Sequence, residues 1–225
     1  MYMSDQALPY VEVNPSHQAK ATVIWLHGLG DSGNGFAPIV PELKLPAELA
    51  IRFVFPHAPM RSVTINNGMS MRAWYDITSL DFNNRADSQG VKESSALVAD
   101  LIEKEIAQGI PANKIVLAGF SQGGVIALNL GIRYEKTLAG IMSMSSYMSE
   151  PEKLNDESHS ANKNTPIFVA HGTHDDVVPI FMGNAAFKVL ESNGYPATWH
   201  EYAMQHNVCA QQLNDISSWL QDKLC

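Results

Sequence analysis

Ser121 lies at the centre of the pentapeptide GFSQG, residues 119–123. The apolar run 115–118 precedes this pentapeptide, and an amphipathic pattern typical of a helix follows it. Glycines two positions before and after a serine permit a turn so tight that Cβ atoms there would collide with the neighbouring backbone. Such a turn lifts the Ser121 hydroxyl above a sheet and points the first N–H groups of the helix at whatever binds there. The pattern therefore predicts a nucleophilic serine on a strand–turn–helix, the arrangement called a nucleophile elbow.

A serine hydroxyl is a poor nucleophile near neutral pH, so it needs a base to take its proton and an acid to orient that base. After a nucleophile elbow the acid and then the histidine come from loops that follow later strands. The segment HGTHDDVVP follows one apolar run and supplies Asp175 and Asp176, and AMQHNV follows the next run and supplies His206. The other histidines lie in polar stretches, inside a strand pattern or at the ends of other strands, so His206 is the predicted base. Spacing alone leaves Asp175 and Asp176 as alternative acids.

This chemistry also needs two backbone N–H groups aimed at the negative charge that develops on the substrate oxygen. One is expected from Gln122, the residue after the nucleophile. The other is expected from a loop after an early strand, where the segment WLHGLGD has glycines that let a backbone approach a ligand closely. Leu29 in that loop is the predicted second donor, with a simple glycine-rich turn as the alternative.

Apolar runs recur along the chain with helix-like stretches between them, which indicates strands buried on both faces. The runs cover residues 22–26, 51–55, 115–118, 138–142, 167–170 and 197–202. Helical patterns cover about 92–108, the elbow to about 134, about 179–193 and about 208–223. This alternation predicts an α/β fold with one domain over residues 1–225, a mostly parallel central sheet and helices on both faces.

The composition argues against several classes of protein. A formal net charge of −8 and a pI near 5.4 argue against nucleic acid or an anionic membrane surface as the main partner. Residues 1–20 lack the features of a secretory signal, and no run approaches the length of an integral membrane segment. Cys209 is expected on the apolar face of the last helix, and Cys225 ends the sequence. Two thiols outside any metal-spaced cluster indicate a cytoplasmic protein.

Six motifs, in order along the chain, resemble one known family. They are WLHGLGDSGNGF, FPHAP, MRAWYD, AGFSQGG, HGTHDDVVP and MQH, and the resemblance runs from about residue 8 to residue 222. The sequence is similar to the carboxylesterase and acyl-protein thioesterase family, also described as phospholipase/carboxylesterase. The resemblance implies a minimal α/β-hydrolase without a large lid, which needs no metal and no cofactor and often forms a homodimer. It implies small-molecule esters, lysophospholipids or acylated proteins as substrates.

The resemblance also implies roles for individual residues. Ser121 matches the nucleophile and His206 the base. The family's H-G-x-x-D-x-x-V-P pattern selects Asp175 as the acid. Leu29 and Gln122 match the two donors of the oxyanion hole.

Further matches concern the site that binds the acyl chain. Trp74 matches an aromatic residue beside that site, and Val177 and Tyr147 match positions that line it. Tyr147 stands where some members carry tryptophan, which affects the expected acyl-chain preference. Asp176 stands where some members carry proline, which leaves a second carboxylate close to the acid.

Two segments do not follow the alternation of strands and helices. Residues 59–80 carry methionines and aromatic residues without clear periodicity, and residues 149–165 are polar and are expected to form a surface excursion. Long loops in compact domains are often functional, and methionine adapts to irregular apolar partners. Residues 59–80 are therefore a candidate wall for an acyl chain, with a loop packed on its own core as the alternative.

The predicted function is a serine hydrolase that cleaves carboxylic esters or thioesters with short-to-medium acyl chains through an acyl-enzyme. Lysophospholipase activity or protein S-depalmitoylation is the alternative within the same chemistry. A metal-dependent hydrolase built on His171, His174, Asp175 and Asp176 is a second alternative, although zinc sites usually need another ligand at a preorganised spacing. The third alternative is a noncatalytic binding module on a hydrolase scaffold.

Overall fold

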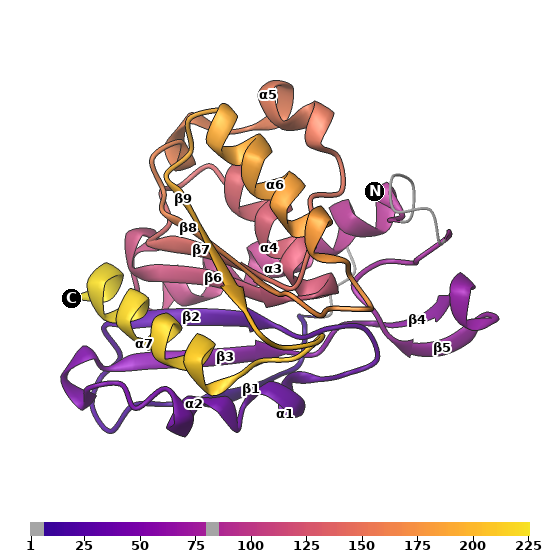
Figure 1. The fold of residues 1–225 in the computed structure, drawn as a ribbon. Helices are drawn as coiled ribbons and strands as arrows, with labels where there is room; N and C mark the ends of the chain where they lie inside the picture. Colours follow the sequence, from indigo (N-terminus) through magenta and orange to yellow (C-terminus); the bar gives the residue numbers. More distant parts are fainter. Residues whose placement is uncertain (1–6, 80–85) are drawn as a thin grey trace.

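The computed structural model describes residues 7–79 and 86–225, and its centre is a seven-stranded sheet (Figure 1). The strand order is β1-β3-β2-β6-β7-β8-β9, in which β1 is antiparallel to β3 and the other neighbours are parallel. These strands are β1 (Tyr10–Val13), β2 (Ala21–Leu26), β3 (Ile51–Pro56), β6 (Ile115–Phe120), β7 (Gly140–Met144), β8 (Ile167–Gly172) and β9 (Ala197–Tyr202). A separate antiparallel hairpin consists of β4 (Met60–Val63) and β5 (Met69–Arg72).

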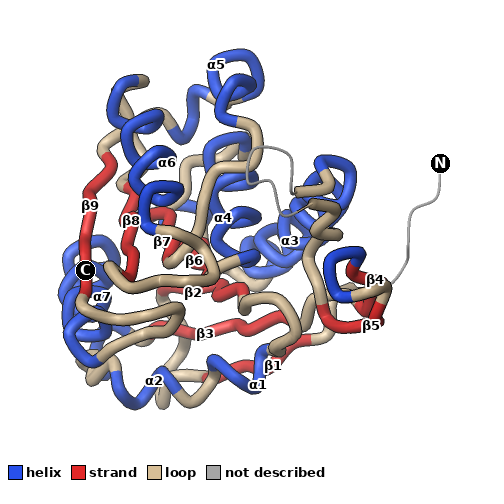
Figure 2. The backbone as a smooth tube through the Cα atoms, turned by 45° about the vertical axis from the view of Figure 1, so that its right-hand side comes forward, coloured by secondary structure: helices blue, strands red, loops and turns tan. Residues whose placement is uncertain are grey.

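Helices cover both faces of the sheet. They are α1 (Gly33–Phe36), α2 (Ile39–Glu42), α3 (Ser88–Ala107), α4 (Gln122–Arg133), α5 (Leu154–Glu157), α6 (Ile180–Ser192) and α7 (Ala210–Leu224). In Figure 1, α3, α4 and α6 lie on one side of the sheet and α1, α2 and α7 on the other. Figure 2 shows the β4–β5 hairpin projecting beside this layered body. No helix in the two described ranges combines the length and the apolar character that crossing a membrane requires.

Each face of the sheet has its own hydrophobic core, because successive strand residues point to opposite faces. On β2, Ile24 and Leu26 belong to the core that includes residues of α3, α4 and α6. Val23 and Trp25 belong to the core that includes residues of α7. All four side chains are fully buried. Burial on both faces explains why the parallel strands read as continuous apolar runs in the sequence.

The predicted α/β architecture, a mostly parallel central sheet with helices on both faces, is confirmed, with differences at particular elements. β7 begins at Gly140 rather than at residue 138. The expected loop 59–80 contains the β4–β5 hairpin, whose four-residue strands are too short to show a period; Leu80 lies outside the described residues. Cys209 is the residue before α7 rather than within the helix, but it is half-buried and packs against the same core as the apolar face of α7.

The parallel strands end at one edge of the sheet, and four of them lead into candidate site residues. β6 leads into Ser121, β8 into the loop that carries Asp175, β9 into the loop that carries His206, and β2 into the loop that carries Leu29. Open α/β sheets bind ligands at the carboxyl ends of their strands. The topology therefore assembles the candidate site at this edge.

Candidate active site

Ser121 occupies a strained turn between β6 and α4. Its backbone angles, φ 55° and ψ −120°, are those of the first central residue of a type II′ turn, a conformation that favours glycine. A Cβ atom on Gly119 would lie 2.1 Å from the Gly123 carbonyl oxygen, and one on Gly123 would lie 2.4 Å from the Leu26 carbonyl oxygen. Only glycine fits at these two positions. The tight turn expected from the pentapeptide is confirmed.

A continuous chain of hydrogen bonds joins Ser121, His206 and Asp175. The Nε2 atom of His206 lies 2.9 Å from Ser121 Oγ, and its Nδ1 atom lies 2.7 Å from Asp175 Oδ2. An ionised carboxylate only accepts hydrogen bonds, so the Nδ1–H of His206 donates to Asp175. Nε2 then carries the lone pair that accepts the Ser121 hydroxyl proton. The structure thus brings together the three residues that the sequence singled out.

The Asp175 carboxylate is buried and held by backbone N–H groups. Its Oδ1 atom accepts hydrogen bonds from the N–H of Val177 at 3.0 Å and the N–H of Val178 at 2.8 Å. Burial alone would raise the pKa of Asp175, but the hydrogen bonds from His206 and Val178 hold it below its usual range. Asp176 is exposed. Of the two carboxylates that spacing left open, Asp175 is the one that faces His206.

A second histidine, His171, lies behind Asp175. Its side chain is fully buried at the end of β8, and Nε2 lies 2.8 Å from the Val178 carbonyl oxygen and 3.5 Å from Asp175 Oδ2. Burial lowers the pKa of His171, so the ring is neutral and its Nε2–H donates to Val178. His171 therefore supports the loop that carries the acid. The sequence placed this histidine at a strand end but gave no sign of that contact.

The loop after β2 passes close to Ser121. A Cβ atom on Gly28 would lie 3.4 Å from the Ser121 Cβ, so glycine keeps a side chain out of the space beside the nucleophile. Within residues 7–79 and 86–225, the N–H groups of Leu29 and Gln122 donate no hydrogen bond to another protein group. Gln122 begins α4, where unpaired N–H groups are expected. Both groups remain available to a ligand oxygen.

Trp74 lies in the core. Its side chain is fully buried, and its indole N–H donates to the His27 carbonyl oxygen at 2.8 Å. Its backbone N–H donates to Gln122 Oε1 at 2.8 Å, and Gln122 Nε2 donates to the Tyr75 carbonyl oxygen at 2.6 Å. The Gln122 side chain thus ties the segment after β5 to the elbow, a role that the sequence does not reveal. The expected contact between Trp74 and an acyl chain requires accessible surface, which Trp74 lacks in this structure.

Tyr147 and Val177, the other residues expected at the acyl site, differ in exposure. Val177 is 51% exposed and lies in the loop that carries Asp175. Tyr147 is buried, with its hydroxyl 2.9 Å from that of Tyr75, and it lines a cavity of about 430 Å³. Phe181 and Met182 of α6 line the same cavity. Ser88, Glu150 and Glu152 add polar groups to the lining, so the cavity offers an apolar ligand both apolar surface and polar contacts.

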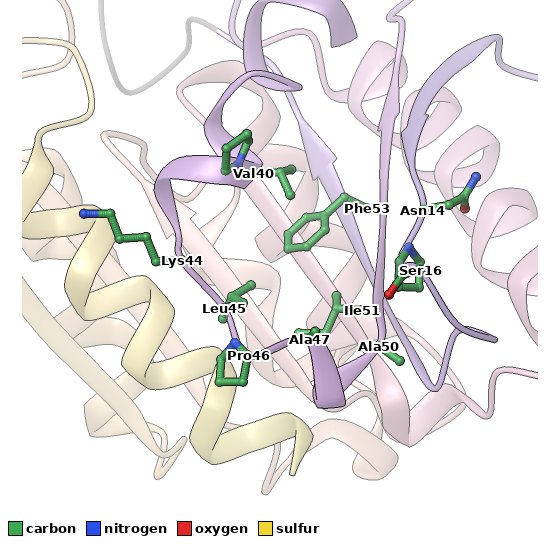
Figure 3. Close-up of a pocket in the computed structure, with 12 residues that line it drawn as sticks. Asn14, Ser16, Val40, Lys44, Leu45, Pro46, Ala47, Ala50, Ile51 and Phe53 are labelled. Carbon is green, nitrogen blue, oxygen red and sulfur yellow. The ribbon is translucent and has the colours of Figure 1, made fainter.

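A smaller cavity of about 230 Å³ lies where α2, the segment after it and the start of β3 meet (Figure 3). Val40, Leu45, Ile51 and Phe53 supply apolar surface to it. Ile51 is the first residue of β3, so this cavity lies toward the amino end of that strand. The candidate site lies at the carboxyl ends of the strands, and the smaller cavity is therefore not part of it.

The arrangement of side chains does not favour the metal-dependent alternative. Among the described residues, no three His, Cys, Asp or Glu side chains gather in a way that could hold a metal ion. His171 is fully buried, whereas His174 and Asp176 are exposed. Although these residues are close in the sequence, some are buried and others exposed, so they do not point toward a common metal position.

A family model described as phospholipase/carboxylesterase matches residues 9–224. The chain belongs to this family. It is 40% identical over 213 residues to acyl-protein thioesterase 1 of Neurospora crassa, a match that covers 91% of this chain and 87% of that protein. It is 36% identical over 221 residues to acyl-protein thioesterase 1 of Yarrowia lipolytica, with 96% and 97% covered.

Solved structures of similar proteins have the same fold. SOBER1 of Arabidopsis thaliana superposes with a TM-score of 0.86 at 33% identity, which covers 92% of this chain and 100% of that one. Acyl-protein thioesterase 2 of Zea mays superposes with a TM-score of 0.84 at 26% identity, with 96% and 99% covered. This phospholipase/carboxylesterase family member is an α/β-hydrolase that acts on esters or thioesters. The family and the hydrolase class expected from the six motifs are confirmed.

The buried histidines predict how the stability of this hydrolase depends on pH. Burial lowers the pKa of His27 and of His171, so below about pH 6.5 the unfolded chain binds more protons than the folded protein. The free energy of unfolding should therefore decrease as the pH falls from about 7 to about 5, by up to about 1.4 kcal/mol per pH unit for each histidine. Urea unfolding across this range measures the slope. His171→Gln should make the slope shallower, whereas His159→Gln, at an exposed position, should not. A slope of zero in the unmodified protein would contradict the prediction.

Proposed function

We propose that Ser121 is the nucleophile of this hydrolase, His206 its general base and Asp175 the acid that orients His206. The observation that carries this proposal is the chain of two hydrogen bonds, 2.9 Å between Ser121 Oγ and His206 Nε2 and 2.7 Å between His206 Nδ1 and Asp175 Oδ2. The first distance suits proton transfer, and the second suits the hydrogen bond that orients His206. Because Asp175 stays ionised, it holds His206 in the tautomer with an unprotonated Nε2.

The reaction proceeds through an acyl-enzyme. The Ser121 oxygen attacks the acyl carbon as its proton passes to His206 Nε2, and the carbonyl oxygen becomes negatively charged. We assign the stabilisation of this charge to the N–H groups of Leu29 and Gln122. The intermediate expels an alcohol or a thiol, which takes the proton from His206. A water molecule that gives its proton to His206 then hydrolyses the acyl-enzyme and restores Ser121.

The proposed substrates are esters or thioesters with short-to-medium acyl chains. The cavity of about 430 Å³ beside Tyr147 supports this choice. Ser146, the residue before Tyr147, donates from Oγ to the Ser121 carbonyl oxygen at 2.8 Å, which joins the elbow to the segment that lines the cavity. The relatives named acyl-protein thioesterase 1 favour thioesters of acylated proteins, with lysophospholipids as the alternative. An acylated peptide thioester assayed beside a lysophospholipid of equal chain length distinguishes them.

The proposed location is the cytoplasm. Cys209 and Cys225 are both free thiols, which suits a reducing compartment. Association into a homodimer stays a prediction, and sedimentation of the purified protein tests it.

Ser121→Ala should abolish turnover, because a triad nucleophile is worth roughly 10⁶-fold in kcat. Hydrolysis of a p-nitrophenyl ester and labelling by a fluorophosphonate both report the loss. Ser192→Ala, at an exposed serine on α6, is the matched control and should keep normal activity. More than a few per cent of wild-type activity in folded Ser121→Ala would disprove the assignment.

Asp175→Asn should slow turnover far more than Asp176→Asn, since only Asp175 fixes the tautomer of His206. The expected loss for Asp175→Asn is roughly 10⁴-fold in kcat. Asp176→Asn changes the adjacent carboxylate in the same way, so it controls for the local change in charge. The reverse ranking would identify Asp176 as the acid.

Activity on p-nitrophenyl esters should rise from acetate to medium chains and then fall, because each buried methylene stabilises the bound chain by about 0.8 kcal/mol until the cavity ends. Ala185→Trp places a large ring in the cavity and should lower octanoate hydrolysis far more than acetate hydrolysis. Lys188→Trp adds the same ring on α6 at an exposed position that does not line the cavity, and should change neither. Equal losses on both esters in Ala185→Trp would place the acyl chain elsewhere.

A further inference from the structure

The peptide between Gly28 and Leu29 determines where the proposed oxyanion donor of the β2 loop points. A trans peptide is planar, so its carbonyl oxygen and its N–H point in opposite directions. Whatever fixes the Gly28 carbonyl therefore also fixes the Leu29 N–H. Glycine itself tolerates many backbone conformations and does little to fix this peptide. The carbonyl needs a partner of its own.

His27 supplies the shorter of two hydrogen bonds to this carbonyl; the other comes from the N–H of Asp31, 3.3 Å from the Gly28 oxygen. The Nδ1 atom of its ring lies 2.7 Å from the Gly28 carbonyl oxygen, and its Nε2 atom lies 3.0 Å from the backbone nitrogen of Ala58. A backbone N–H can only donate, so Nε2 must accept, and the proton of a neutral ring must be on Nδ1. The Nδ1–H of His27 then donates to the Gly28 carbonyl.

The surroundings keep His27 in this neutral form. Its side chain is fully buried, and burial lowers its pKa although the hydrogen bond to Gly28 acts in the opposite direction. A second proton on Nε2 would face the N–H of Ala58, and two donors cannot form a hydrogen bond. The tautomer is therefore fixed from both sides of the ring.

Trp74 holds the backbone of the same residue. Its indole N–H donates to the His27 carbonyl oxygen at 2.8 Å, and the two ring centroids lie 5.3 Å apart. The backbone N–H of Trp74 donates in turn to the side chain of Gln122. Since Gln122 carries the other proposed oxyanion donor, one buried network joins both donors.

We infer that His27 is a positioning residue for the oxyanion hole: it holds the Gly28–Leu29 peptide so that the Leu29 N–H faces the space beside Ser121. The inference rests on the proposed role of Ser121 as the nucleophile. Without the Nδ1–H donor, only the longer hydrogen bond from the Asp31 N–H holds the Gly28 carbonyl, so the peptide can rotate and present this oxygen to the developing negative charge. A rotated peptide stabilises the transition state less but leaves the binding of the neutral ester almost unchanged.

Three substitutions of His27 distinguish the effect of its Nδ1–H donor from that of its Nε2 acceptor. His27→Phe removes both and should lower kcat about 100-fold while KM changes little. His27→Asn places an amide N–H near the Nδ1 position and should recover most of kcat, whereas His27→Gln keeps only an acceptor near Nε2 and should not. His200→Phe removes a ring that stacks on Phe168 on β8 and should leave kcat unchanged. A normal kcat in folded His27→Phe, or a higher kcat in His27→Gln than in His27→Asn, overturns the inference.

A trifluoromethyl ketone provides a readout that a purely structural role would not affect, because its adduct with serine carries the oxyanion. Its inhibition constant should rise by about the same factor as kcat falls. Nitrogen NMR of the ring in the unmodified protein gives a test that does not depend on the folding of any variant. We expect the Nδ1–H tautomer of His27 at neutral pH, and an Nε2–H tautomer or a doubly protonated ring overturns the inference.

Fluorophosphonate labelling of the unmodified protein keeps the two proposals distinguishable. No label on Ser121 would refute the proposed function itself. Labelled Ser121 together with unchanged kcat and ketone inhibition in His27→Phe would refute only the role of His27.

Discussion

The first turn of α4 packs on the end of β2, backbone against backbone. A Cβ atom on Gly123 would lie 2.4 Å from the Leu26 carbonyl oxygen and 2.7 Å from the His27 carbonyl oxygen. This contact brings the N–H of Gln122 and the loop that carries Leu29, from segments far apart in the sequence, to the same serine. The hydrogen bonds of the site depend on it, because a side chain at position 123 would force β2 and α4 apart.

The polar groups around this contact are arranged so that little has to move when charge develops. Asp175 is ionised and already accepts from two backbone N–H groups. His27 and His171 are buried, and both pKa values are lowered. Fixed dipoles in a site that excludes water stabilise charge without the cost of reorganisation. The hydrogen-bond partners of Asp175, His171 and His27 are mostly backbone groups. The site side chains are therefore held by the same backbone that forms the sheet and its loops.

The sequence predicts the parts of the site that depend on chain order and burial. The flanking glycines predict the elbow, and continuous apolar runs predict parallel strands because both faces of the sheet are covered. No sequence pattern shows how a single side chain is oriented. Spacing did not distinguish Asp175 from Asp176 as the acid. The two residues are adjacent, and only the conformation of the loop determines which carboxylate faces His206. The contacts of Gln122 and His171 stay hidden for the same reason, and the four-residue strands of the β4–β5 hairpin are too short to show a period.

The backbone conformation of Ser121 sets the stability of the fold against the chemistry of its active site. Its φ of 55° is costly for any residue with a side chain, by about 1–3 kcal/mol, and comfortable for glycine. The turn therefore draws on a total stability that amounts to only about 5–15 kcal/mol for a typical domain. A glycine at this position would relieve the strain of the turn, but it would remove the proposed nucleophile. Without a demand for catalysis, the fold would gain stability by losing its serine.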